Sequence, residues 1–301
     1  KQFVDEHDLI NPVLVDCTSS QELADSYVSY LRAGFHVVTA NKKANTGPLA
    51  YYRELRKAAA QGRRQFLYDT NVGAGLPVID NLKGLLAAGD QLLRFGGVLS
   101  GSLSFIFGKL DEGLSFSEAT RIARERGFTE PDPRDDLSGK DVQRKLLVLA
   151  RELGVTLELA DIALQPLLPA GLEQGSWQQF WSQRAVLDDA MAQVFASAKA
   201  AGKVLRYVAS LKLEQGKVCA TVALQQVSAE HALAAIAPCD NVFVIRSLWY
   251  CENPLVLKGP GAGRQVTAGG VHADLAILAK QKIAAAKAAK HSQAQAAAWV
   301  K

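Results

Sequence analysis

Residues 12–40 read PVLVDCTSSQELADSYVSYLRAGFHVVTA, and the fold class follows from their pattern. The short apolar run at 12–16 predicts a buried strand, and the pattern over 21–32, which stops at Gly34, predicts a helix. A second strand is expected over 35–40, where apolar and β-branched residues return. Strand, helix and strand in this order are typical of a βαβ unit.

The alternation continues further along the chain. A helix is expected over 49–60, ending near Gly62, and a third strand over 66–68. This order predicts a parallel sheet with helices on its faces, a partial Rossmann-type α/β fold. Ligands of such sheets bind beyond the carboxyl ends of the strands, which here are the segments at 18–19, 41–42 and 71–72.

The rest of the chain has a different pattern. A helix is expected over 77–89 and an apolar strand over 92–99. The runs at 204–208 and 218–227 flank a turn and predict a β-hairpin, and 242–249 predicts a further strand. We therefore expect a second, α+β domain after the parallel sheet.

Composition excludes several classes of protein. The 301 residues, 49% hydrophobic and 21% charged, are typical of a globular protein of about two domains. A net charge of +4 without a basic patch before the last turns makes a nucleic-acid partner unexpected. Apolar runs such as 146–150 are much shorter than the ~20 residues of a membrane span, so no membrane partner is expected.

The first residues and the cysteines indicate the cellular compartment in which the protein is expected. Residues 1–8 contain no apolar signal core, so export is not expected. The four cysteines have neither Cys-x-x-Cys spacing nor nearby histidines, which argues against structural zinc and a disulfide framework. They are Cys17, Cys219, Cys239 and Cys251. A reducing cytoplasm is the expected location.

The densest polar segment spans residues 129–145. Ser138, with Asp141 three residues later, is expected to cap a helix that ends at Gly154, and Asp141 and Lys145 lie one turn apart on it. A carboxylate one turn before an amine can orient that amine for proton transfer. From spacing alone, an exposed i,i+4 ion pair worth ~0.2–0.5 kcal/mol is the more common arrangement.

Two glycine clusters, at 72–77 and 259–263, could bring backbone close to a ligand. The dinucleotide fingerprint G-x-G-x-x-G needs a third glycine where Val78 stands, and the second cluster has its third glycine too early. As bare patterns, both clusters are more often tight turns. The histidines are scattered and no serine lies in a nucleophile elbow, so nothing supports a catalytic triad.

Four segments together strongly resemble the homoserine dehydrogenase family. They are Thr129 to Lys145, Asn41-Lys42-Lys43-Ala44, Asn71-Val72-Gly73-Ala74-Gly75-Leu76-Pro77 and Leu99-Ser100-Gly101-Ser102-Leu103-Ser104. The resemblance runs from about residue 12 to about residue 274 and is greatest to the dehydrogenase half of bacterial bifunctional aspartokinase/homoserine dehydrogenases. It implies NAD(P)-dependent interconversion of L-aspartate 4-semialdehyde and L-homoserine, in the pathway to threonine and methionine.

The resemblance also implies roles for individual residues. Lys145 matches the catalytic lysine that donates a proton to the aldehyde oxygen, Lys42 matches a lysine beside cofactor and substrate, and Asp141 completes the catalytic group. The implied substrate-binding residues are Glu130, Asp136 and Asp141. The implied cofactor-binding residues are Thr18, Lys42, Gly127 and Gly263. The implied sodium ligands are Asp69, Val72, Ala74 and Leu76.

The chain departs from the family pattern in three ways. The family's opening strand, glycine-rich phosphate turn and helix do not precede Lys1, and the aspartokinase half is missing. Without that turn, dinucleotide affinity should collapse, so we expect no measurable turnover from the 301 residues alone. An Ala- and Lys-rich tail replaces the usual ending beyond about residue 276, and we expect an exposed helix without a functional role there.

The expected organisation follows from the same comparison of motifs. Residues 1–70 form a partial NAD(P)-binding domain completed by about 263–282, residues 71–262 form a catalytic and dimerisation domain, and 283–301 form the tail. A homo-oligomer, dimer or tetramer, is expected. Two alternatives remain open: a non-catalytic oligomerisation module that pairs through the β-rich region at 204–258, and a Schiff-base enzyme that uses Lys145 covalently.

Overall fold

The computed structural model describes residues 6, 11–214 and 216–299, and side chains as far as residue 281. Its first part is the predicted parallel sheet, with strand order β1 (Val13–Asp16), β2 (His36–Thr39) and β3 (Phe66–Leu67). Val13 is paired with His36, and Val37 with Phe66. The helices of this part are α2 (Gln21–Asp25), α3 (Tyr27–Arg32), α4 (Lys43–Thr46) and α5 (Leu49–Gly62).

Two details of this part differ from the sequence prediction. The single helix expected over 21–32 is two helices, because the Ser26 hydroxyl donates to the Leu23 carbonyl (2.7 Å) and competes with the helical ladder. The left-handed residue that ends α5 is Arg63, with φ of 50°, whereas Gly62 is still helical.

The second part is built on a six-stranded sheet of order β5-β7-β6-β4-β8-β9. Its strands are β4 (Leu92–Val98), β5 (Ala163–Leu164), β6 (Lys203–Glu214), β7 (Lys217–Ser228), β8 (Asp240–Ser247) and β9 (Leu255–Pro260). Neighbouring strands are antiparallel except β5 and β7. The predicted hairpin is confirmed as β6 and β7, which pair along their full length.

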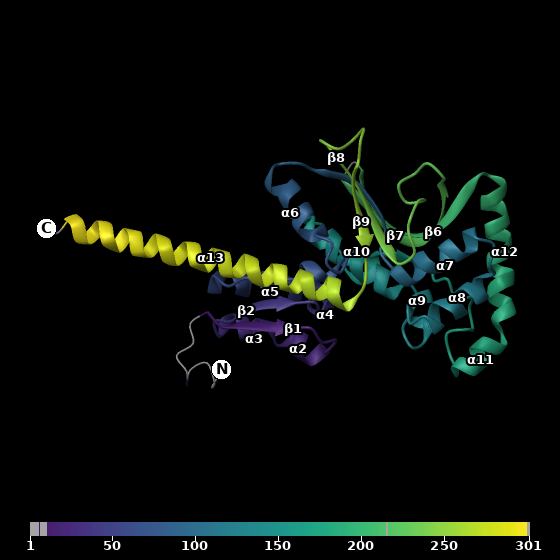
Figure 1. The fold of residues 1–301 in the computed structure, drawn as a ribbon, viewed down its shortest axis with the longest axis horizontal. Helices are drawn as coiled ribbons and strands as arrows, with labels where there is room; N and C mark the ends of the chain where they lie inside the picture. The colour runs from purple at the N-terminus through teal and green to yellow at the C-terminus, as the bar shows by residue number, and fades with distance from the viewer. Residues whose placement is uncertain (1–5, 7–10, 215, 300–301) are drawn as a thin grey trace.

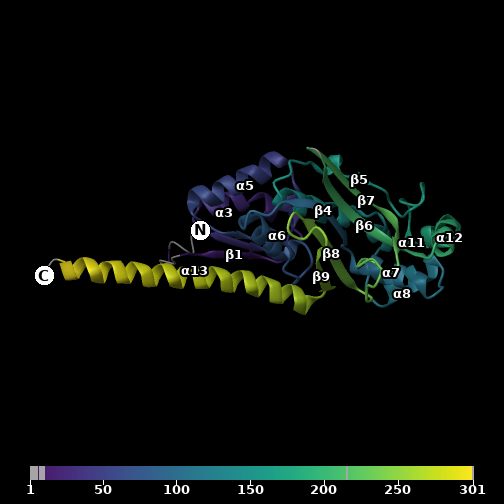
Figure 2. The ribbon, with the colours of Figure 1, turned by 90° about the horizontal axis from the view of Figure 1, so that it is seen from above.

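Helices pack mainly on one side of this sheet (Figures 1 and 2). They are α6 (Val78–Ala87), α7 (Gly101–Asp111), α8 (Phe116–Glu125), α9 (Pro133–Leu137), α10 (Lys140–Glu152), α11 (Trp177–Ser182) and α12 (Arg184–Ala200). Two 3-10 turns, η1 (Asp69–Asn71) and η2 (Leu159–Asp161), complete the connections. No helix among the described residues is long and apolar enough to cross a membrane.

The chain ends in α13 (Arg264–Trp299), one continuous helix that contacts β2 and η1 near its start and then extends away from the body of the protein (Figures 1 and 2). Its beginning requires glycines in the facing loop, because a Cβ on Gly75 would lie 2.4 Å from the Val266 carbonyl oxygen. The cluster at 72–77 is therefore a close-packed turn against α13. The helix expected in the Ala- and Lys-rich tail is confirmed.

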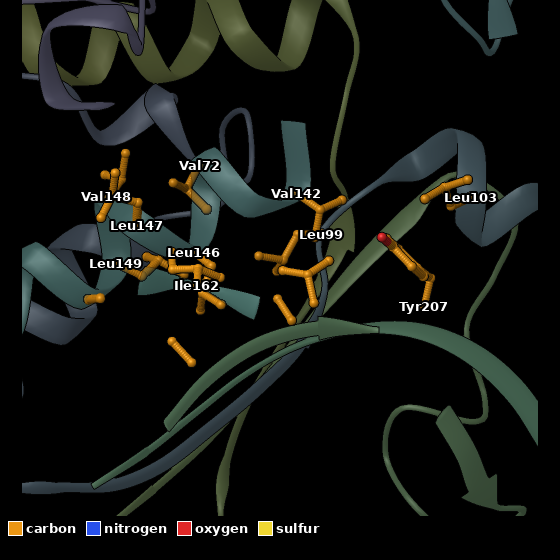
Figure 3. Packing of buried hydrophobic residues seen from close by; sticks show 14 of the residues in the cluster. Val72, Leu99, Leu103, Val142, Leu146, Leu147, Val148, Leu149, Ile162 and Tyr207 are labelled. Atoms are coloured by element: carbon orange, nitrogen blue, oxygen red, sulfur yellow. The ribbon is translucent and has the colours of Figure 1, made fainter. Parts of the chain in front are cut away.

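Helix α10 is the centre of the core. It contacts α4 and α6 on the side of the parallel sheet and β6 and β7 on the other side. For this reason its buried surface is wider than the predicted stripe, and Leu147 and Val148 are as fully buried as Leu146 and Leu149 (Figure 3). Residues 146–151 are all buried, and this burial fixes the second half of the helix, because apolar interiors pack at near-crystalline density.

Gly139, immediately before α10, should be intolerant of any side chain. Its φ is +72°, and a Cβ would lie 2.0 Å from the Tyr207 hydroxyl, which is itself held by the Gln165 carbonyl (2.7 Å). We expect Gly139→Ala to lower the free energy of unfolding by about 3–4 kcal/mol, from left-handed strain and overpacking together. Urea denaturation measures the change.

Gly154→Ala is the matched control. Its φ is +76°, but nothing lies within 4 Å of the added Cβ. Backbone strain alone should therefore cost about 1–2 kcal/mol. Equal losses for the two variants would show that the contact with Tyr207 is not the cause.

Candidate active site

The Asp141 carboxylate lies between two ammonium groups. Its Oδ2 is 2.8 Å from Nζ of Lys145, one turn along α10, and its Oδ1 is 3.0 Å from Nζ of Lys42, which precedes α4 at the end of β2. The Lys145 side chain is only 14% exposed. The three residues predicted as the catalytic group therefore lie together, and the Asp141–Lys145 pair is more than an exposed ion pair.

Lys145 is also fixed by the backbone. Its ammonium donates to the Leu99 carbonyl oxygen (2.8 Å), where β4 ends. An ammonium has three N–H donors. Since the described residues supply two acceptors, Asp141 and Leu99, one N–H remains for a ligand.

The charge on Asp141 is stabilised by its neighbours. Burial raises the pKa of this carboxyl, but Lys145 and Lys42 more than offset the effect and hold the pKa well below its usual range. The carboxylate is therefore ionised at neutral pH. It orients both lysines and is too weak a base to take a proton itself.

Acidic and hydroxyl side chains line the adjacent hollow, which has a volume of about 480 Å³. Asp136 lies here, half-buried, and accepts hydrogen bonds from the Ser102 hydroxyl (2.6 Å) and the Glu130 backbone N–H (2.8 Å). Burial raises the pKa of Asp136 in spite of these bonds. Lys140 and Arg144 also line the opening, so its charge is mixed, and its size suits a small amino acid.

Local structure before α10 differs from the prediction in one respect. The cap residue of α10 is Gly139 and not Ser138. The Ser138 hydroxyl donates to the Asp135 carbonyl (2.6 Å) at the end of α9 and accepts the N–H of Lys140, the first residue of α10 (3.3 Å). The short helix α9 was not predicted, although the sequence contains the residues that typically begin a helix. Asp132 caps it by accepting from the Arg134 N–H (3.0 Å), and Pro133 occupies the first helical position.

The expected cofactor residues come from separate segments of the chain. Thr18 and Lys42 follow the adjacent strands β1 and β2 at the carboxyl edge of the parallel sheet, where dinucleotides bind in such folds. Gly127 follows α8 and Gly263 lies between β9 and α13, both with positive φ.

The four residues expected to bind sodium lie in the single loop from η1 to α6. The Asp69 carboxylate accepts the Asp80 N–H (3.0 Å), and burial raises its pKa to about 7. Ala74 is left-handed, with φ of 55°, which turns the backbone of this loop. Among the described residues, no group of three His, Cys, Asp or Glu side chains could hold a metal ion.

Ser100 and Ser102 were not assigned a role from the sequence. Their hydroxyls lie 2.9 Å apart at the start of α7, where Ser100 caps the helix and Ser102 donates to Asp136. The signal that could have found them is the Ser-Gly-Ser sequence directly after a buried strand. A serine in this place is a common helix cap.

Comparison with known proteins identifies the family. Residues 77–276 match the family described as homoserine dehydrogenase, and residues 1–69 match the NAD binding domain of homoserine dehydrogenase. The chain belongs to the homoserine dehydrogenase family. The lysine and carboxylate cluster described above lies within these two matched regions.

Several relatives of this homoserine dehydrogenase family member are bifunctional. The chain is 53% identical over 274 residues to a bifunctional aspartokinase/homoserine dehydrogenase of Haemophilus influenzae, covering 91% of this chain and 33% of that protein. It is 45% identical over 268 residues to bifunctional aspartokinase/homoserine dehydrogenase 2 of Escherichia coli, with 89% and 33% covered. The chain thus spans about a third of the length of these curated relatives.

Solved structures agree with this assignment. A Candida auris protein of unknown function has a TM-score of 0.87 and 35% identity, covering 93% of this chain and 79% of that one. A hyperthermophilic archaeal homoserine dehydrogenase in complex with NADPH has a TM-score of 0.69 and 26% identity, with 93% and 74% covered.

The Asp141 ion pairs should appear in the pH dependence of stability. Because the folded-state pKa of Asp141 lies below its ordinary value of 3.8, the pairs stabilise the fold above about pH 4 and lose this effect as the pH falls through the folded-state pKa. We expect Asp141→Asn to lower the free energy of unfolding at pH 7, and the difference from the parent to narrow below about pH 4.

Urea denaturation between pH 7 and pH 3 measures this difference. Asp189→Asn is the control, because Asp189 is exposed and forms no ion pair with any described residue. If the free energies of unfolding of Asp141→Asn and the parent differ by the same amount from pH 7 to pH 3, the prediction is wrong.

Proposed function

We propose that this protein catalyses the NAD(P)-dependent interconversion of L-aspartate 4-semialdehyde and L-homoserine, a step toward threonine and methionine. The observation that carries the proposal is the pair of lysines held by Asp141 beside an acid-lined hollow. The match to the NAD binding domain supports a nicotinamide cofactor, NADP or NAD. Thr18 and Lys42 would contact it at the carboxyl edge of the parallel sheet.

Lys145 has the geometry of a proton donor. A nicotinamide, when bound, supplies the hydride in the reducing direction. As the aldehyde oxygen gains negative charge, the remaining N–H of Lys145 both stabilises that charge and delivers the proton. Asp141 and the Leu99 carbonyl hold the ammonium in place during this step. In the oxidising direction the same lysine takes the hydroxyl proton.

The acidic side of the hollow would bind the other end of the substrate. An α-ammonium group requires carboxylate acceptors, and Glu130 and Asp136 lie on this side. The Glu130 N–H is tied to Asp136 (2.8 Å), which holds the two acids near each other. Lys140 and Arg144 at the same opening could pair with the substrate carboxylate.

A sodium ion and the domain division are further parts of the proposal. Backbone carbonyls at Asp69, Val72, Ala74 and Leu76 would supply oxygen ligands, which suit hard cations.

The packing of the start of α13 on β2 and η1 supports a nucleotide-binding domain that is completed by residues 263–282.

Oligomerisation is the last part of the proposed function. The outer face of the six-stranded sheet carries Val256, which is 40% exposed, and a hollow lined by Arg94 and Arg246. This face supports a homo-oligomer, dimer or tetramer, paired through the β-rich region. The alternative of a purely non-catalytic oligomerisation module would leave the arrangement of Lys42, Asp141 and Lys145 without a role.

Removing the Lys145 amine should abolish most activity. We expect Lys145→Ala to lower kcat for homoserine oxidation by about 10²- to 10⁴-fold, the usual contribution of a positioned proton-transfer group. Cofactor reduction is followed by absorbance in the full-length protein. Lys199→Ala, on the exposed end of α12, is the control.

Two results would count against this role. Activity of Lys145→Ala within a few-fold of the parent would exclude proton transfer by Lys145. A mass increase after borohydride reduction in the presence of the semialdehyde would instead indicate a Schiff base. We expect no such increase.

Glu130 should act on binding more than on chemistry. Because a charge-assisted hydrogen bond contributes about 1.5–3 kcal/mol, we expect Glu130→Gln to raise KM for homoserine about 10- to 100-fold with little change in kcat. Steady-state kinetics in the full-length protein measure both constants. Glu125→Gln, an exposed residue of α8, is the control. An equal loss in kcat would show that Glu130 acts in the chemical step.

A further inference from the structure

The last turn of α10 carries two buried charges with no part in the proton transfer described above. The Arg151 side chain is 0% exposed and the adjacent Glu152 side chain is 5% exposed. Burying a charge is costly unless it is paired and hydrogen-bonded. A glutamate at a helix C-terminus also opposes the helix dipole. Both side chains therefore depend on partners outside α10, and we call the two residues the C-terminal clamp of α10.

Arg151 binds the segment that carries Lys42. Its Nη1 donates to the carbonyl oxygens of Asn45 (2.9 Å) and Gly47 (2.8 Å), which are in and directly after α4. Lys42 is the residue at the start of the same one-turn helix. The other guanidinium nitrogens donate to the Leu157 carbonyl, 3.1 and 3.2 Å away. Arg151 thus joins α10 to α4 through backbone atoms.

Glu152 binds the next elements of the parallel-sheet part. It accepts from the Tyr68 hydroxyl (2.5 Å), after β3, and from Nη2 of Arg56 in α5 (2.9 Å). Arg56 also donates to the Asn45 side chain (3.2 Å). Since Asn45 accepts from Arg151 as well, the two clamp residues act on one connected network.

The clamp determines where the far end of α10 lies. Asp141 and Arg151 are ten residues apart on one helix, about 15 Å along its axis. A tilt of about 5° at the clamp would move Asp141 by about 1 Å relative to Lys42. Misplacement of this size can reduce a reaction rate about 100-fold.

We propose that Arg151 and Glu152 are positioning residues, whose buried contacts to α4, α5 and Tyr68 set the placement of Lys42 against Asp141 and Lys145. This proposal rests on the function proposed above. Arg151 and Glu152 are far from the hollow, but they affect the chemical step because they fix the position of Lys145 through α10 and of Lys42 through α4.

The main test is Arg151→Lys in the full-length protein. Lysine keeps the charge but lacks the planar fork that reaches several carbonyls at once. We expect kcat for homoserine oxidation to fall about 10- to 100-fold with a clearly smaller rise in KM for homoserine, because Glu130 and Asp136 precede α10 and remain in place while Lys140 and Arg144 move with it. The matched control is Arg121→Lys, an exposed arginine of α8, which should leave both constants unchanged.

A second variant covers the case in which Arg151→Lys does not fold. Glu152→Gln keeps the shape and one acceptor for the Tyr68 hydroxyl but loses the charge facing Arg56. It should lower kcat about 3- to 10-fold, again without a matching rise in KM. Thermal unfolding by circular dichroism establishes that each variant is folded at the assay temperature, and rates are expressed per folded protein.

The outcomes separate the two proposals. If Lys145→Ala loses activity while folded Arg151→Lys and Glu152→Gln keep kcat within about 2-fold, the positioning role is wrong and the proposed function stands. A rise in KM equal to the fall in kcat, or an equal effect in Arg121→Lys, also overturns the positioning role. If Lys145→Ala keeps the parent's activity, the proton-transfer role of Lys145 fails, whereas the proposed function itself fails if the full-length parent does not oxidise homoserine.

Discussion

The contact of Asp141 with both Lys42 and Lys145 joins the parallel-sheet part of the fold to the part built on the six-stranded sheet. Lys42 comes from the end of a strand in the parallel sheet, whereas Asp141 and Lys145 come from the helix that packs under the six-stranded sheet. Two ammonium groups at this spacing repel each other unless an anion lies between them. The carboxylate offsets this repulsion and fixes the position of each ammonium group relative to Asp141, which lines the hollow.

The core makes this arrangement possible because α10 is held on every side. A helix with one exposed face could rotate or shift to relieve the cost of a desolvated lysine. Leu146 to Leu149 are buried in α10, which lies between α4 and α6 on one side and β6 and β7 on the other, so rotation of α10 would expose apolar area on one side and create voids on the other (Figure 3). Apolar packing thus holds the charged residues at the edge of the helix, where they have partners and access to the hollow.

Much of the fold could be predicted from the sequence, but less of the site. The alternation of strands and helices before residue 70 and the hairpin of β6 and β7 follow from periodicity, which depends on neighbouring residues. The break between α2 and α3 depends on one hydrogen bond of Ser26, and the need for glycine at position 139 depends on the Tyr207 hydroxyl next to it. Neither contact can be predicted from the periodicity of the sequence. The i,i+4 spacing of Asp141 and Lys145 predicts their contact, but nothing local predicts that Lys42 lies opposite.

A single helix therefore has opposite tasks at its two ends. Near its start it presents the Asp141 carboxylate to a polar hollow and holds Lys145 beside that carboxylate, and at its end it buries an arginine and a glutamate in the parallel-sheet part. Because an α-helix transmits a displacement along its whole length with little bending, contacts at one end act on geometry at the other. Arg151 and Glu152 lie at the opposite end of α10 from Asp141, so their charges do not compete with the two lysines for the substrate. The rigid helix still lets them set the position of Asp141 and Lys145.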